Sequence, residues 1–326
     1  MSRLSLLLCV ALTAVLVLAV LLGETPLSAA QMMQALNQPS SPPGEVLWSI
    51  RAPRAATAAV VGAGLGLAGA AMQGLLRNPL ADPGVLGVSA SSGLGAALVI
   101  AFGLAATPGA IEAAALGGAL VAGLLVVGLA ARFREPETLI LFGVSLSAFA
   151  GALTALVFNL SPSPVSTTEV LAWLLGSAAN RDWADVARTI GPMAVGAGLC
   201  AYAGRGLVML TLGEETAAMS GLPMARLRTA AVAGAALLSG AAVAAAGVIG
   251  FVGLAAPHLV RRGVGDDPQA ALAPSAVAGA LLLTAADLAA RMMPTEQELK
   301  LGVVTALFGA PLFALVAWRA ARSWRT

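Results

Sequence analysis

The stretch that decides the fold is Ala55–Leu76, which reads AATAAVVGAGLGLAGAAMQGLL and holds no charged residue. A helix needs roughly 20 mostly apolar residues to cross about 30 Å of hydrocarbon, and its backbone polar groups must be satisfied within the element. Gly62, Gly66, Ala70 and Gly74 recur every four residues, which places small side chains along one helix face. The stretch therefore predicts a membrane-spanning helix that packs closely against another helix.

The rest of the chain repeats this pattern. Of its 326 residues, 59% are apolar and only 10% are charged, whereas globular domains carry about 25% charged residues. The further apolar runs are Leu4–Leu22, Val85–Leu104, Ile111–Ala131, Leu139–Leu160, Val186–Leu207, Thr229–Gly247, a short one at Val248–Val260, Ala271–Ala290 and Gly302–Ala320. We expect an all-α integral membrane protein with about ten transmembrane helices in a single domain, residues 1–326.

The distribution of basic residues predicts the orientation. With ten spans and the N-terminus inside, 12 of the 18 basic residues fall on the cytoplasmic side, as the positive-inside rule requires. The first run is longer than the apolar core of a secretory signal, about 7–15 residues, so it is interpreted as a retained span. Both termini are expected to be cytoplasmic, with two polar segments outside, at Glu24–Ser49 and Ser161–Trp183.

Composition excludes several kinds of chemistry. The two cysteines, Cys9 and Cys200, lie in separate apolar runs, and His258 is the single histidine, so neither a disulfide framework nor a histidine metal cluster is expected. The single lysine, Lys300, follows Leu299, so the chain has no phosphate loop of the form GxxxxGK. We therefore predict no catalytic, cofactor or metal site, and no ATP hydrolysis by that route.

Two polar stretches flank predicted spans. Arg77–Gly84 reads RNPLADPG; its prolines break the helix, and Asn78 and Asp82 can cap the next helical turn. It is either a tight cytoplasmic turn or a loop that narrows a pore. Leu212–Pro223 alternates apolar and charged positions at helical spacing, which predicts one or two short helices. It is either a solvated connection or a docking helix for a cytoplasmic partner.

A third group of charges lies at the expected outer ends of two spans. Arg51 and Arg54 begin one span, and Asp287 and Arg291 lie one helical turn apart at the end of another. The arginines either snorkel to headgroups, with Asp287 in an i, i+4 pair, or form a cationic rim that receives an acidic partner. A deeply placed Asp287 would point to function, because intramembrane acids usually face a cavity.

In this order, these pieces resemble the permease subunit of bacterial ABC importers for iron–siderophores, haem and vitamin B12. The resemblance covers nearly the whole chain. Its residues are Arg51–Arg54, Gly69–Gly87, Trp173–Ser177, Leu212–Leu222, Gly247–Leu254, Pro257–His258, Ala286–Asp287 and Gly309–Phe313.

The resemblance implies the type II ABC importer permease fold in the bacterial inner membrane. It also implies a homodimer, two cytoplasmic ATPase subunits that bind ATP and Mg, a periplasmic or lipid-anchored substrate-binding protein, and alternating access. This chain itself would bind no cofactor, and its cargo would be a metal chelate that the sequence does not specify.

The resemblance also assigns residues. Arg51, Arg54 and Arg291 match outer arginines that receive acidic residues of the binding protein, and Asn78 and Leu80 match a cytoplasmic gate. The ATPase-coupling segment spans residues 208–228. Its matched residues are Leu212, Gly213, Glu214, Glu215, Ala217, Ala218, Met219, Gly221 and Leu222. One departure is Glu298–Leu299–Lys300, where the family usually has Glu–Leu–Pro.

Two other classes of function stay open on the sequence alone. The main rival is an ion- or proton-coupled secondary transporter in which Asp287 and Glu112 would carry protons. The third class is a membrane scaffold or sensor that transports nothing.

Overall fold

The computed structural model describes residues 3–105, 107–133, 136–295 and 298–323, and all regular structure in these ranges is helical. Seven helices or continuous helical segments are long and apolar enough to cross a membrane. They are α1 (Arg3–Leu21), α4 (Ala52–Leu76, extended at its start to Pro42), α6 (Ala110–Arg132), α7 (Pro136–Leu160), α9 (Trp183–Leu210), α11 (Met224–Ala246) and α13 (Pro268–Met292). The predicted all-α membrane architecture is confirmed.

Three more helices correspond to the remaining expected runs. These are α5 (Val88–Ala101), α12 (Val252–Val264) and α14 (Leu301–Ser323). The predicted run Val85–Leu104 is wrong at its start, because a 3₁₀ turn at Pro83–Leu86 and the left-handed Gly87 precede the helix. The expected short run at Val248–Val260 begins late for a similar reason: Gly247 and Phe251 both have positive φ, which interrupts the helix between α11 and α12.

The segments expected outside the membrane contain helices of their own. The first holds α2 (Ala29–Asn37), α3 (Pro42–Glu45) and a π-helical turn, Val46–Arg51, that leads into α4. Ser28 and Gln31 form a capping box at the start of α2. The second segment holds α8 (Pro164–Leu174). The Trp183 indole N–H donates to the Trp48 carbonyl at 2.9 Å, which ties the two outer segments together.

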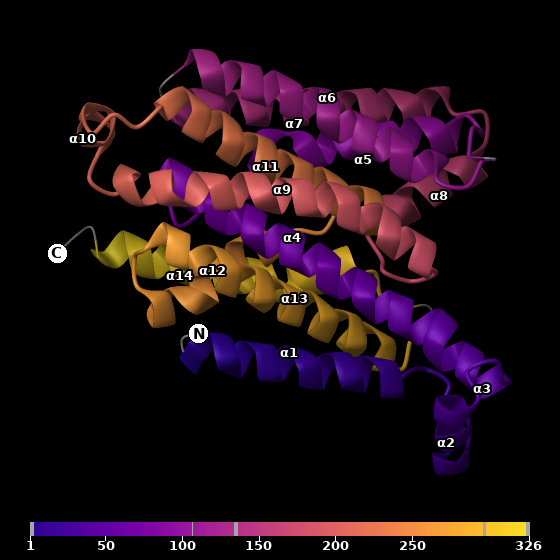
Figure 1. The fold of residues 1–326 in the computed structure, drawn as a ribbon. Helices are drawn as coiled ribbons and strands as arrows, with labels where there is room; N and C mark the ends of the chain where they lie inside the picture. Colours follow the sequence, from indigo (N-terminus) through magenta and orange to yellow (C-terminus); the bar gives the residue numbers. More distant parts are fainter. Residues whose placement is uncertain (1–2, 106, 134–135, 296–297, 324–326) are drawn as a thin grey trace.

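Helix α4 forms the centre of the bundle, with α13, α12, α11 and α9 packed against it (Figure 1). α1 packs on the outer side of α13, whereas α5, α6 and α7 form the opposite side next to α11. α10 (Glu214–Met219) lies at the same end of the bundle as both chain termini (Figure 1).

The small-residue stripe is the reason α4 can occupy this central position. A Cβ added at Gly62 would lie 2.8 Å from the carbonyl carbon of Gly279, and one added at Gly279 would lie 3.0 Å from the Cα of Gly66. The backbones of α4 and α13 therefore touch directly, as small residues permit between membrane helices. The prediction that the stripe serves close helix packing is confirmed.

Candidate gate, docking and coupling sites

The three outer arginines lie together, but inside the protein. Arg51, Arg54 and Arg291 are 4%, 8% and 5% exposed, and Asp287 between them is fully buried. Arg54 Nη2 lies 2.8 Å from Asp287 Oδ1, and Arg291 Nε forms an ion pair with Asp287 Oδ2 at 3.1 Å. The expected i, i+4 pair is thus confirmed. Headgroup snorkelling is wrong for Arg54 and Arg291, because an internal carboxylate holds both side chains.

A second carboxylate, Glu298, also belongs to this cluster. Both terminal nitrogens of Arg54 contact Glu298, with Nη1 at 3.2 Å from Oε2 and Nη2 in a closer ion pair with Oε1. This partner was not predicted from the sequence, where Glu298 stood only within a departure from the family pattern. The available signal was an acidic residue in the outer segment just before the last span, on the same side as the three arginines.

The remaining donors of the cluster hold the end of α1. Arg51 Nη1 donates to the Leu21 carbonyl at 2.7 Å, and its Nη2 donates to the Thr25 carbonyl. Arg291 Nη2 donates to the Ala19 carbonyl at 3.1 Å. The last carbonyls of a helix have no partner within it, so these two arginines cap α1 from outside. The docking role of the arginines stays a prediction.

The predicted gate loop is held by local hydrogen bonds. Arg77 ends α4 with a left-handed φ of 47°. The Asn78 side-chain oxygen accepts from the Leu80 N–H at 2.9 Å, and the Asp82 Oδ1 accepts from the Gly84 N–H at 2.7 Å. Burial raises the pKa of the Asp82 carboxyl, and the hydrogen bond from Gly84 partly offsets this increase.

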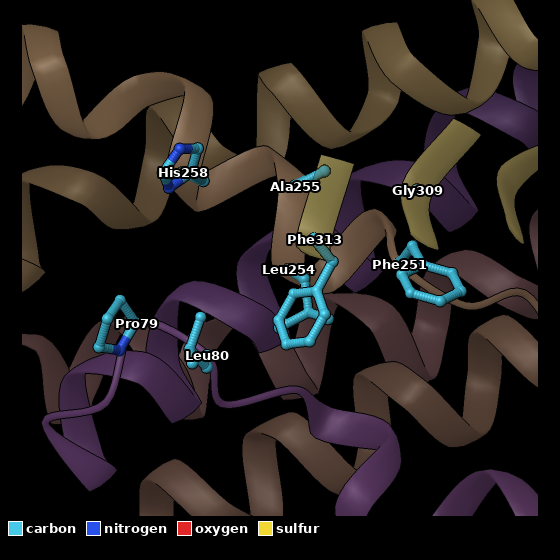
Figure 2. A pocket seen from close by; sticks show the side chains of 8 residues that line it. All are labelled: Pro79, Leu80, Phe251, Leu254, Ala255, His258, Gly309 and Phe313. Atoms are coloured by element: carbon cyan, nitrogen blue, oxygen red, sulfur yellow. The ribbon is translucent and has the colours of Figure 1, made fainter. Parts of the chain in front are cut away.

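The gate loop faces an apolar cavity. Leu80 lines it together with Leu254 of α12 and Phe313 of α14, and Figure 2 shows these three side chains gathered from three separate elements. Pro79 and His258 also line this cavity. Leu80 is thus placed where a shift of α12 or α14 would change its surroundings. The function of Asn78 and Leu80 as a gate stays a prediction.

The predicted coupling segment forms one short helix, α10, rather than two. Gly213, with φ of 100°, precedes the helix, and Ala217 is its buried contact. Met219 is 89% exposed and Leu212 is 65% exposed. An ion pair of 2.7 Å between Glu214 and the buried Arg228 of α11 fixes the segment to the bundle. The segment therefore exposes the apolar side chains of Leu212 and Met219 while the Glu214–Arg228 ion pair holds it against α11. Its coupling role stays a prediction.

The acids named for the rival mechanism are both paired. Glu112 forms an ion pair with Arg181 at 2.5 Å, and Asp287 is shared by Arg54 and Arg291. Each of these two carboxylates therefore has an arginine partner in the structure.

These features define a multi-pass helical membrane protein with a helix break between α11 and α12 and a short helix, α10, at one end of the bundle. A family model described as "FecCD transport family" matches residues 11–319. The chain belongs to the FecCD transport family.

Relatives and one solved structure agree with this assignment. The chain is 38% identical to the uncharacterized ABC transporter permease protein YvrB of Bacillus subtilis, over 86% of this chain and 81% of that protein. It is 40% identical to the vitamin B12 import system permease protein BtuC of Vibrio cholerae, over 91% and 88% respectively. A structure described as an inward-facing conformation of a transporter of the metal-chelate ABC type matches with a TM-score of 0.87 and 30% identity. That match covers 97% of this chain and 99% of the other.

The protein is therefore the permease subunit of an ABC importer with the type II fold. In this family the permease is the transmembrane subunit, and the ATPase site lies on another subunit. An importer of this kind works with ATPase and substrate-binding partners. The comparisons give no support to an ion- or proton-coupled transporter.

Proposed function

We propose that this permease moves a metal chelate, of the cobalamin, ferric siderophore or haem class, into the cytoplasm of a bacterium by alternating access. The observation that carries the proposal is the match, over nearly the full length of both chains, to a metal-chelate type transporter. A relative named for vitamin B12 import makes cobalamin the first cargo to test.

The working unit is a homodimer in the inner membrane, with both termini of each copy in the cytoplasm. Two ATPase subunits bind ATP and Mg and associate with α10 of each copy through its exposed apolar residues. A periplasmic or lipid-anchored binding protein delivers the chelate at the opposite end. The common position of both termini and α10 at one end of the bundle supports this orientation.

The proposed mechanism transmits motion through packed helices. ATP-driven closure of the ATPase pair displaces α10, and the Glu214–Arg228 ion pair carries that displacement into α11. The loop with Asn78 and Leu80 then opens or closes the cytoplasmic end of the path between the two copies. Small shifts between closely packed helices are a common form of such switching.

The test of cargo is uptake into proteoliposomes that hold the permease, its ATPase and ATP, with the binding protein outside. Radiolabelled cobalamin, a ferric siderophore and haem are compared in parallel. ATP-dependent accumulation of one chelate supports the proposal and identifies the class. Accumulation of none, in a complex that hydrolyses ATP when its binding protein is added, contradicts the metal-chelate assignment.

A further inference from the structure

The two carboxylates that bind Arg54 differ in accessibility. The Asp287 side chain is fully buried and forms ion pairs with both Arg54 and Arg291. The Glu298 side chain is 25% exposed and lies in the segment that leads into α14, where Arg54 is its ion-pair partner. Asp287 is therefore the enclosed counter-ion of Arg54, and Glu298 is the partly exposed one.

The charge of the cluster also indicates that Arg54 needs a carboxylate partner. Among the described residues, the positive charges of Arg51, Arg54 and Arg291 are opposed by two carboxylates, Asp287 and Glu298, which leaves one positive charge in excess. A buried cation is costly without a partner, so Arg54 needs carboxylate contacts whether or not another protein is bound. Any acidic group that approaches Arg54 from outside meets a guanidinium whose outer nitrogens are already occupied.

We propose that Glu298 is an exchangeable internal counter-ion of Arg54, which an acidic side chain of the substrate-binding protein displaces when that protein docks. The inference rests on the proposed function, in which a binding protein delivers the chelate, and on the predicted role of Arg54 in docking that protein. In the free permease Glu298 neutralises Arg54, and in the docked complex the partner's carboxylate takes over this contact. Docking affinity is therefore the difference between two carboxylate contacts with the same guanidinium.

The exchange also has a structural consequence for α14. Glu298 lies three residues before Leu301, whose N–H donates to the Gly176 carbonyl at 2.9 Å, and the Gly302 N–H donates to the Leu175 carbonyl at 3.0 Å. These bonds connect the start of α14 to the end of α8. Release of Glu298 by a docked partner thus frees one attachment of the segment that continues into α14, while the backbone attachment to α8 remains.

The test is the dissociation constant between the purified binding protein and the permease–ATPase complex in nanodiscs, measured by biolayer interferometry. Glu298→Gln should tighten docking by about five-fold, the scale of a partly exposed charge pair. Arg54→Gln should weaken docking, and in its background the effect of Glu298→Gln should vanish. Glu45→Gln is the matched control, because it removes an exposed carboxylate of the first outer segment that is not one of the cluster's two counter-ions.

Each outcome separates the inference from the docking proposal. Unchanged or weaker docking by Glu298→Gln, with Arg54→Gln still harmful, overturns the exchange and leaves docking at Arg54 standing. Equal tightening by Glu45→Gln also overturns it, since the effect would then be one of total charge. Failure of the Glu298→Gln variant to fold also overturns the exchange, because an exchangeable counter-ion must be dispensable in the free permease. No effect of Arg54→Gln removes the docking role itself.

Discussion

Replacing Gly62 by alanine should destabilise the permease more than any comparable change at an exposed glycine. The added Cβ would lie 2.8 Å from the Gly279 carbonyl carbon and 2.9 Å from the Leu283 Cβ. Both lie on α13, and the carbonyl carbon belongs to the backbone, so a rotamer change cannot relieve the contact. α4 and α13 must move apart along their closest approach.

The size of the effect depends on this geometry. Overpacking a tight core costs about 1–3 kcal/mol, and the upper end applies where backbone is the obstacle. A loss of about 3 kcal/mol corresponds to an apparent unfolding temperature lower by roughly 6–12 °C, for a domain somewhat smaller than this one. Gly198→Ala is the control, because a Cβ there meets nothing within 4 Å. Alanine at that helical position should be neutral or stabilising by up to about 1 kcal/mol.

The assay is thermal unfolding in detergent, followed with a thiol-reactive fluorescent dye. Cys200 is fully buried in the native state and reacts only after unfolding, whereas the partly exposed Cys9 is replaced by serine in every variant. Equal unfolding temperatures for Gly62→Ala and Gly198→Ala would refute the direct backbone contact between α4 and α13.

Three further predictions concern other parts of the chain. Met219→Arg places a charge on the most exposed apolar side chain of α10 and should abolish co-purification of the ATPase. The control Met33→Arg, on α2, should leave co-purification intact. Co-purification of the ATPase with both variants would contradict the coupling role. The raised pKa of Asp82 means that its ionisation costs folding free energy, so stability should fall as pH rises from the ordinary aspartate range through that raised value. Asp82→Asn should flatten the unfolding temperature measured from about pH 4 to 8, and an unchanged slope would rule out Asp82 as the group responsible. Gln73→Met should raise the unfolding temperature, because both side-chain amide atoms of Gln73 are buried without a hydrogen-bond partner among the described residues; a lower temperature would contradict this view.

The sequence predicted the parts of the fold that depend on composition alone. Long apolar runs such as Ala55–Leu76 have one stable form in lipid, and the four-residue spacing of small side chains within this run identified its packing face. The interruption at Gly247–Phe251 was harder to predict. Gly247 lies so close to the backbone of Trp173 and Gly176, far away in sequence, that an added Cβ would meet it. Phenylalanine itself gives no sign of the positive φ at Phe251.

The outer charge cluster was likewise predictable only where its contacts are local in sequence. The pair of Asp287 with Arg291 follows from helical spacing and could be predicted. The contacts of Arg54 with Asp287 and Glu298 join residues 233 and 244 positions apart. The packing of α4 against α13 creates the first contact, and the position of the segment before α14 creates the second. Sequence patterns therefore identified the arginines but not their burial. Their side chains form no open cationic rim, because they are buried and two internal carboxylates offset part of their charge.

The measurement that tests the central claim most directly is ATP hydrolysis by the reconstituted transporter. The permease is co-expressed with its candidate ATPase and placed in lipid, and turnover is measured with and without the substrate-binding protein. For an ABC importer permease we expect a stable complex of two permease and two ATPase subunits, whose turnover rises when the binding protein is added. Failure of any ATPase to associate, together with chelate uptake driven by a proton or sodium gradient, would contradict this function.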